Sequence, residues 1–160
     1  PGNYCNSSVA VGWQKGDAGF DNTAVLSRMV GKLAFDGDIA SWSARMTRRM
    51  AAWAAEFKAA RHLMVQDFHQ LRPQPQTAED WDVLQFIDYA GKDAALFVFA
   101  GSAAGRQRIA LKGLHPDRTY SVSRRPKGKP RSVAGADLLG KGLAVSMEPG
   151  EAGLWRLHAV

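Results

Sequence analysis

Two histidines and an aspartate are the first residues of this chain that could bind a metal. His62 and His69 are seven positions apart, with Asp67 between them. Histidines that hold zinc from one helix are usually about four positions apart, and no cysteine lies nearby to complete a ligand set. We therefore interpret both histidines as partly buried side chains with ordinary hydrogen bonds, and we expect neither a metal nor a cofactor.

Cys5 is the only cysteine and the only candidate thiol nucleophile. Neither a histidine nor an aspartate stands beside it to activate the thiol, so we do not expect it to be catalytic. A single cysteine also leaves no internal disulfide. That fits a reducing compartment only weakly, because bacterial secreted enzymes often lack disulfides as well. The compartment, cytoplasmic or secreted, therefore stays open.

The acidic residues that could act as a general acid or a nucleophile form two small groups. The first is Asp36 and Asp38 on either side of Gly37, and the second is Glu79, Asp80 and Asp82 around Trp81. Both groups are typical of turns, where carboxylates cap backbone N–H groups. No glycine-rich loop precedes a helix in the way a phosphate site needs. The sequence therefore assembles no catalytic set.

Basic residues exceed acidic ones and give a net charge of +6, concentrated in one helical segment and one loop. The helical segment holds Arg45, Arg48, Arg49, Lys58 and Arg61, and the loop spans residues 124–131. A basic excess raises the possibility of nucleic-acid binding. However, the loop has no interleaved aromatic residues on which bases would stack. We interpret both segments as solvated surfaces, and nucleic acid as an unlikely partner.

The elements that would position these residues change type between Arg72 and Trp81, where Pro73 and Pro75 exclude a continuous helix or central strand. Before this break, a short helix is predicted from Thr23 to about residue 33, ending in a turn at residues 35–38. Residues 1–22 are irregular, with at most one short strand.

A second helix begins near Ser41 or Ser43 and carries an apolar stripe on one side. The stripe consists of Trp42, Met46, Met50, Trp53 and Phe57, and Glu56 falls with the basic residues on the opposite side. Such a stripe must lie against a large apolar body. The short preceding helix is too small to cover it, so we expect that body to lie outside this chain.

After the break, six short segments are predicted to be strands. They are residues 83–89, 94–99, 106–112, 119–124, 142–148 and 154–159. Their spacing, with turn residues between them, is typical of a β-sandwich. Residues 96–99 are apolar on both faces, which predicts a central strand.

From about Phe35 onward, several segments occur in an order that is similar to the end of one enzyme family. They are residues 61–63, 67–71, 80–86, 109–122, 134–139 and 141–145. The strand, turn and strand from Leu111 to Val122 are the most specific of these, followed by the glycine and leucine pattern from Gly135 to Leu143. The chain thus resembles the C-terminal part of the melibiase-type alpha-galactosidases, family 36 of the glycoside hydrolases (clan D), or a close relative.

This resemblance implies an α+β fragment, in which the terminal helices of a (β/α)8 barrel precede an antiparallel β-sandwich. Residues 1–72 would end the barrel catalytic domain, with the helix around Trp53 as its last helix, and residues 73–160 would form the C-terminal β-sandwich. Tyr4, Cys5 and Asn6 would lie in a loop near the substrate. The family is retaining and uses two aspartates from earlier barrel strands. Neither motif occurs here, so we expect no catalytic residue in this chain, no identifiable substrate-binding residue, and no activity from the chain alone.

The expected partners follow from this interpretation. Carbohydrate would bind through the missing barrel, and the β domain would pack on the rest of the parent enzyme and stabilise it. A membrane is not expected, because no apolar run reaches the roughly 18–20 residues that span a bilayer. The sequence also contains no charged and then apolar leader that would be typical of a signal peptide. The irregular start at Pro1 is what a truncation would leave. The alternatives are a free-standing carbohydrate-binding β module and, less favoured, a basic nucleic-acid-binding protein.

Overall fold

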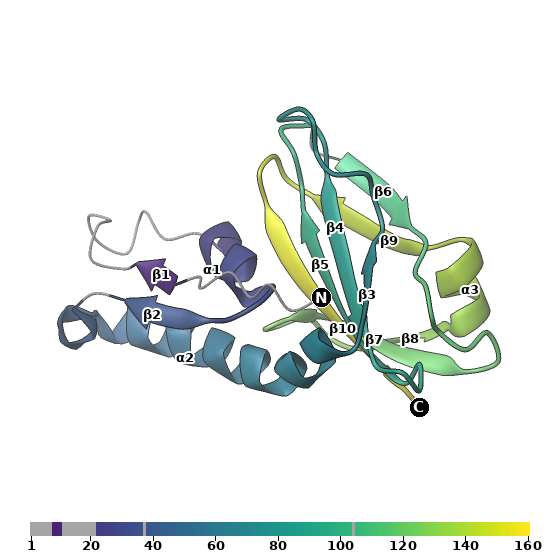
Figure 1. The fold of residues 1–160 in the computed structure, drawn as a ribbon, viewed down its shortest axis with the longest axis horizontal. Helices are drawn as coiled ribbons and strands as arrows, with labels where there is room; N and C mark the ends of the chain where they lie inside the picture. The colour runs from purple at the N-terminus through teal and green to yellow at the C-terminus, as the bar shows by residue number, and fades with distance from the viewer. Residues whose placement is uncertain (1–7, 11–21, 37, 104) are drawn as a thin grey trace.

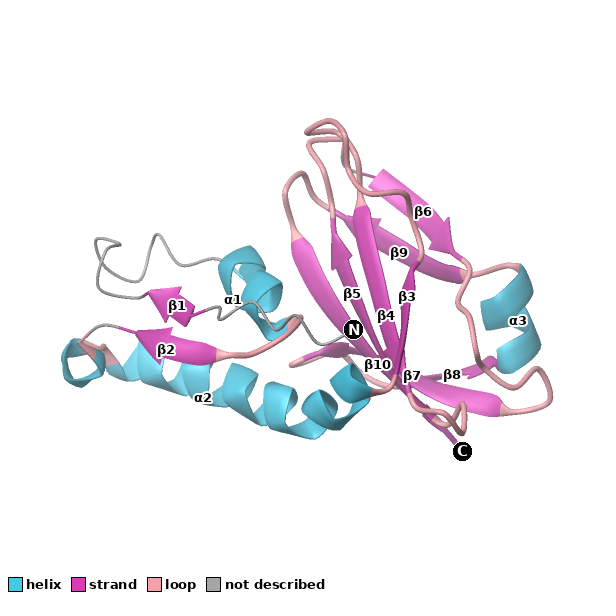
Figure 2. Cartoon of the chain, in the orientation of Figure 1, coloured by secondary structure: helices cyan, strands magenta, loops and turns pink. Residues whose placement is uncertain are grey.

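The computed structural model describes residues 8–10, 22–36, 38–103 and 105–160. It has two parts that lie side by side (Figure 1). A helical part with two short strands comes first in the sequence, and a larger part made almost entirely of strands follows. Figure 2 shows the same division by secondary structure. The chain is therefore α+β, as the sequence indicated.

The helical part begins with two parallel strands joined through a helix. Strand β1 (Ser8–Ala10) pairs in parallel with β2 (Ala34–Asp36), and α1 (Asn22–Met29) lies between them in the sequence. Parallel strands need such a crossover connection. The predicted turn at residues 35–38 is wrong in part, because residues 35 and 36 continue β2. A strand of three residues is too short for its alternation to be recognised.

The long helix α2 (Ala44–Ala60) follows a 3-10 turn, η2 (Ile39–Ser41). Its N-terminus is capped by Ser43, whose hydroxyl accepts a hydrogen bond from the Met46 amide at 3.1 Å. Alanines fill much of its length and favour the helix. Its C-terminus leads directly into a second 3-10 turn, η3 (Arg61–Val65). The predicted helix is confirmed, and of the two predicted starts, Ser41 and Ser43, the structure has Ser43 as the N-cap.

The apolar stripe of α2 is covered within this chain, which corrects the expectation that its cover lies elsewhere. Met46, Met50 and Trp53 are at most 4% exposed. They share one buried cluster with apolar residues of α1 and of the large sheet. These residues are Val25, Leu26 and Met29 from α1 and Phe86, Phe97 and Leu154 from the sheet. The stripe looked uncovered because periodicity in the sequence identifies a helix face but not the distant strands that meet it.

The large part is a six-stranded antiparallel sheet with a two-stranded sheet on one face. The strand order of the large sheet is β3 (Asp67–Gln70), β4 (Asp82–Ile87), β5 (Asp93–Phe99), β10 (Ala152–Ala159), β7 (Thr119–Arg125), β8 (Arg131–Ala134). The small sheet pairs β6 (Gly105–Ile109) with β9 (Leu143–Met147). All six predicted strands are confirmed, with small shifts at their ends, and the arrangement is the predicted β-sandwich.

Three elements of this part were not predicted. They are the edge strands β3 and β8 and the short helix α3 (Gly135–Gly140). Both edge strands have four residues and are largely exposed, so no alternation of buried and exposed positions marks them. By contrast, Leu96, Phe97 and Val98 are fully buried in β5, between two neighbouring strands, as predicted for residues 96–99.

The large sheet has an apolar core on each face. One face meets α1 and α2, and the other meets β6, β9 and α3. Gln85 is completely buried on the second side, but its amide is satisfied. It donates to the Lys112 carbonyl at 2.7 Å and accepts from the Lys112 amide at 3.0 Å. This side-chain bridge attaches β4 to the segment that follows β6.

Glu56 is buried, which corrects its assignment to the solvated side of α2. Its side chain is 7% exposed and pairs with Arg125 at the end of β7. The guanidinium Nε donates to Oε2 at 2.9 Å and Nη2 donates to Oε1, so the contact is bidentate. The hydrogen bond that Arg125 donates to Glu56 raises the pKa of Arg125 above its ordinary value, against the opposing effect of burial. This ion pair connects the two parts of the molecule.

Among the described residues, none of the helices combines the length and apolarity that a membrane crossing requires.

We expect Met50→Ala to lower the free energy of unfolding by about 2–5 kcal/mol, because truncation of a buried side chain leaves a cavity between α2 and the sheet. Lys58→Ala is the matched control on the exposed side of the same helix, and its effect should stay within about 0.5 kcal/mol. Urea unfolding followed by circular dichroism measures both. Equal effects of the two substitutions would show that the stripe is not a core.

We expect Glu56→Gln to destabilise the fold by about 1.5–3 kcal/mol, because Arg125 loses its charged acceptor. Glu148→Gln, at an exposed position, is the control. The second test is a double-mutant cycle with Arg125→Gln, in which the two losses should be clearly less than additive. Additive losses would mean that the two side chains do not stabilise the fold as a pair.

Candidate functional site

The edge at which β1 and β2 end is the first place to look for chemistry. In units of alternating strand and helix, functional loops follow the C-terminal ends of parallel strands. Those ends are Ala10 and Asp36. Asp38 follows closely, and its carbonyl accepts hydrogen bonds from the Ser41 amide and hydroxyl at 3.2 and 2.8 Å. This edge therefore holds a turn at Asp38, as predicted, but the backbone carbonyl makes it: the Asp38 carboxylate, expected to cap, forms no side-chain cap hydrogen bond.

The three residues that the family resemblance placed near substrate, Tyr4, Cys5 and Asn6, lie outside the described residues. The segment that contains them precedes β1 in the chain. Their role in substrate contact stays a prediction.

His62 and His69 do not share a helix face. His62 is exposed on η3, and His69 is half-buried on the edge strand β3. The part of the chain that the structure describes holds no group of three His, Cys, Asp or Glu side chains arranged around a possible metal. The two histidines are close in sequence, but they lie on different elements, because the chain changes from a 3-10 turn to a strand between them.

The acidic residues around Trp81 serve local structure. Oδ2 of Asp80 accepts from the backbone amides of Gln76 and Thr77 at 2.9 and 2.8 Å. These hydrogen bonds, with one from the Thr77 hydroxyl, lower the pKa of Asp80 below its ordinary value. The indole of Trp81 is buried and donates to the Ala103 carbonyl at 2.9 Å. The prediction that this group forms a turn is confirmed for Asp80.

Asp82 differs from its neighbours because burial raises the pKa of its carboxyl above the ordinary value. Its Oδ1 is buried and has no hydrogen-bond partner. Glu79 and Asp80 line a pocket of about 380 Å3 that Asp82 does not line. The three carboxylates therefore do not converge on a single substrate position.

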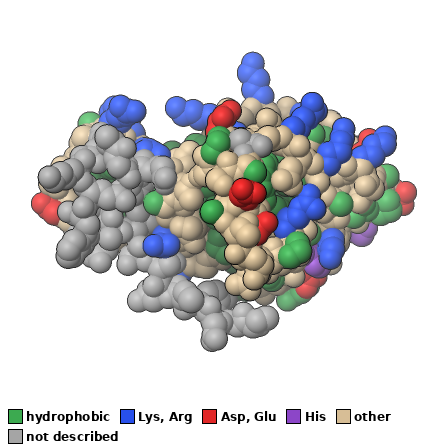
Figure 3. All heavy atoms as spheres, turned by 90° about the horizontal axis from the view of Figure 1, so that it is seen from above, with side chains coloured by type: hydrophobic (Ala, Val, Ile, Leu, Met, Phe, Trp, Pro, Cys, Tyr) green, Lys and Arg blue, Asp and Glu red, His purple; other side chains and the backbone are tan. Residues whose placement is uncertain are grey.

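The two basic segments of the sequence line one groove, which neither segment indicated by itself. This basic groove has a volume of about 750 Å3 and lies between α2 and the hairpin that joins β7 to β8. Its cationic lining residues are Arg45, Arg48 and Arg49 from α2 and Arg124, Arg125 and Lys127 from the hairpin. Glu151 is the one carboxylate among the described residues that line it. Figure 3 shows that Lys and Arg side chains outnumber Asp and Glu on the described part of the upper face.

The hairpin wall of the basic groove is held in a fixed shape. Arg124 pairs with Glu151, and its guanidinium carbon lies 5.1 Å from the centroid of the Trp155 ring. Burial alone would raise the pKa of Glu151, but hydrogen bonds from the Glu148 amide and Arg124 bring it below its ordinary value. The turn itself requires glycine, since a Cβ on Gly128 would lie 2.2 Å from the Arg124 carbonyl oxygen.

The helix wall is ordered by a contact to α1. Arg49 donates to the amide oxygen of Asn22 at 2.9 Å. Arg45 and Arg48 lie on the same side of α2 and are exposed. The prediction of a solvated surface holds for Arg45 and Arg48 on the helix and for residues 129–131 of the loop. It is wrong for Arg124 and Arg125, which are half-buried and paired with carboxylates. It also missed that the helix and the loop face each other, because nothing in local sequence reports a meeting between segments so far apart.

The sequence matches no family model and no curated protein. Solved structures do match, and several of them are alpha-galactosidases. The galactosidase domain of alpha-galactosidase-sucrose kinase, AgaSK, has a TM-score of 0.75 at 18% identity. A variant of the GH36 alpha-galactosidase AgaA from Geobacillus stearothermophilus in complex with stachyose has a TM-score of 0.77 at 20% identity. The alpha-galactosidase from Lactobacillus brevis has a TM-score of 0.76 at 16% identity.

Each of these three matches covers 96% of this chain but 22% of the matched chain. The chain thus spans about a fifth of the length of the structures it resembles. At these identities the likeness establishes the fold. The resemblance to the C-terminal part of the family 36 alpha-galactosidases, indicated by the sequence, is confirmed at that level: the chain folds as a portion of those enzymes.

Proposed function

We propose that this chain is the C-terminal part of an alpha-galactosidase-like retaining glycoside hydrolase acting on terminal alpha-galactosides. One observation carries the proposal: nearly the whole chain superposes on about a fifth of several alpha-galactosidases, across the helical part and the β-sandwich together. A β-sandwich alone recurs in many proteins with different functions. A β-sandwich preceded by β1, α1, β2 and α2 is a much more specific arrangement than the sandwich alone.

The order of elements in the helical part supports the assignment of the first predicted domain to the end of a (β/α)8 barrel. The predicted boundary after residue 72 falls too late, because β3 (Asp67–Gln70) already belongs to the sandwich sheet. Strand, helix, parallel strand and helix follow one another, which is the repeating unit of that barrel. Two strands cannot close a barrel, and within the described residues each of them pairs only with the other. Their remaining edges would be completed by earlier barrel strands. This argument replaces the one from the α2 stripe, which the chain covers itself.

Residues 73–160, with the edge strand β3 (Asp67–Gln70), would form the terminal β-sandwich, whose role is to pack on the barrel and stabilise it. In this proposal the two catalytic aspartates would come from earlier strands of the parent enzyme.

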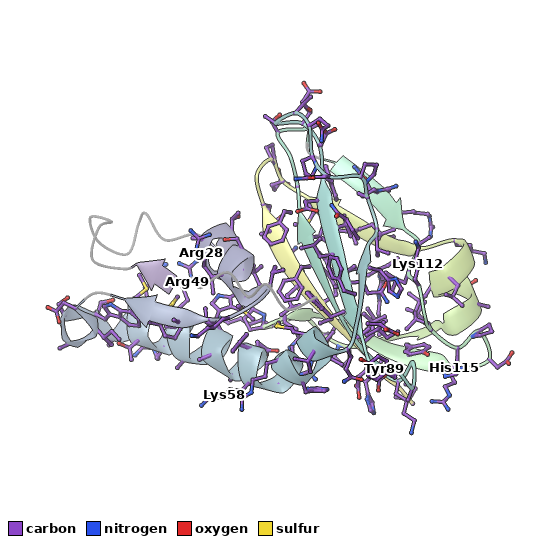
Figure 4. All side chains as sticks on the ribbon, viewed as in Figure 1. Arg28, Arg49, Lys58, Tyr89, Lys112 and His115 are labelled. Atoms are coloured by element: carbon purple, nitrogen blue, oxygen red, sulfur yellow. The ribbon has the colours of Figure 1, made fainter. Side chains whose placement is uncertain are left out.

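The alternative of a free-standing carbohydrate-binding module is less well supported. Such modules present exposed aromatic rings, whereas Trp81, Trp155 and Tyr120 are at most 7% exposed. The exposed rings of the sandwich are Phe68 and Tyr89, and Tyr89 lies near the lower end of the sheet in Figure 4. The Phe68 ring packs against the Phe86 ring, with centroids 5.2 Å apart and the ring planes tilted by 46°. Phe68 and Phe86 therefore do not form a flat platform for a sugar.

We expect the 160-residue chain by itself to show no turnover of an aryl alpha-galactoside above the uncatalysed rate. The reason is that the two aspartates of the retaining mechanism would lie on strands that the chain does not contain. A chromogenic assay, with a complete alpha-galactosidase as the positive control, measures this. Turnover comparable to that of the complete enzyme would contradict the proposal.

In a longer protein that contains this chain, we expect Met50→Ala to lower the midpoint of thermal unfolding by several degrees while leaving kcat/KM nearly unchanged. The substitution would weaken the contact between the helical part and the sandwich without touching substrate. Lys58→Ala in the same protein is the control and should change neither quantity. A large loss of kcat/KM in folded Met50→Ala enzyme would assign this region to the active site instead.

A further inference from the structure

The basic groove gathers positive charge from two walls that are distant in the sequence. On α2, Arg45, Arg48 and Arg49 are spaced so that their side chains leave the same face of the helix. Lys127 projects from the hairpin on the opposite wall. In Figure 4, Arg49 lies on the side of α2 that faces α1, and Lys58 lies on the other side of the helix. The charges are therefore directed into one space.

Part of this charge is not neutralised by the described chain. Arg124 pairs with Glu151 and Arg125 pairs with Glu56. Arg45, Arg48 and Lys127 form no ion pair with any carboxylate of the described residues. Like charges around one groove repel each other and create a positive potential that attracts anions. The groove is thus a region of net positive charge among the described residues.

The walls are ordered before any ligand arrives. The Gly128 amide donates to the Arg124 carbonyl and fixes the turn of the hairpin. The bidentate pair between Glu56 and Arg125 attaches that hairpin to α2. A site whose cations already sit on fixed elements loses less conformational entropy when it binds. The backbone walls of the groove are therefore preorganised for binding an anion.

The donor chemistry and the size of the groove select the class of anion. Arginine presents a planar fork of N–H donors that matches the oxygens of a phosphate group. The lining of α2 extends from Arg45 to Trp53, which is about 12 Å of helix. Trp53 is 2% exposed, so it offers no surface on which a base would stack. These features fit one or two phosphate groups better than a nucleic-acid strand.

We propose that the basic groove binds a small, multiply charged anion of the phosphate class. The shared chemistry is a phosphate monoester or a pyrophosphate group, held by Arg45 and Arg48 from one wall and Lys127 from the other. This site is separate from the proposed glycosidase function, because a neutral galactoside requires no such charges. Its success or failure is therefore independent of the activity assay.

The test is isothermal titration of the 160-residue chain with inorganic pyrophosphate and, separately, with a sugar phosphate, at about 50 mM salt where screening is weak. We expect binding of at least one of them at a stoichiometry near one. The combined variant Arg45→Glu, Arg48→Glu, Lys127→Glu should raise Kd by at least about tenfold. Lys58→Glu makes the same kind of charge change on the same helix but outside the groove, and it should alter Kd by less than about twofold.

Folding of each variant is checked by circular dichroism. Should the combined variant fail to fold, Lys127→Glu alone, at an exposed position in the hairpin, serves as the test and should still raise Kd severalfold. Tighter binding of pyrophosphate identifies the ligand as a free polyphosphate, and tighter binding of the sugar phosphate identifies a phosphorylated sugar; both support the proposal.

Three results would overturn it. They are no binding of either compound below about 1 mM, an unchanged Kd in the groove variants, and a loss in Lys58→Glu equal to theirs. A short single-stranded DNA is titrated in parallel. If it binds while neither phosphate compound does, the groove is a nucleic-acid site and the present proposal is wrong.

Discussion

The apolar contact between α2, α1 and one face of the six-stranded sheet holds the two parts of this chain together. Met50 and Trp53 enter the same buried cluster as Leu26 from α1 and Phe97 from the sheet. Burial of such side chains stabilises by about 1.5–3 kcal/mol each, so this cluster dominates the junction. A hydrogen bond also links the two parts: the Thr23 hydroxyl on α1 donates to the Gly150 carbonyl, between β9 and β10, at 3.0 Å.

The junction also determines where charge can lie. Because α2 must turn its apolar side toward the sheet, its other side passes close to the end of β7. Glu56 is then buried and pairs with Arg125, while Arg45 and Arg48 face the hairpin across the basic groove. The groove is thus a consequence of the same packing that fixes the two parts.

Much of the fold was predictable because its signals are local. Ser43, one of the two serines predicted to start the long helix, is its N-cap. The apolar residues 96–99 lie in a central strand, as predicted. The edge strands β3 and β8 were missed because short exposed strands leave no alternation of burial. For the candidate site, the turn role of Asp80 followed from nearby residues. The basic groove did not, because its walls belong to segments that only the tertiary fold brings together.

The sequence by itself determined the types of the main elements and the resemblance to the end of an alpha-galactosidase. Each of these depends on residues close together in the chain, where periodicity, caps and turn chemistry act. Only the tertiary structure decided that the stripe of α2 is covered by this chain's own sheet, that Glu56 is buried, and that two basic segments share one groove. Such outcomes depend on which surfaces meet across long sequence separations, and hydrophobic burial selects those meetings without a local signature.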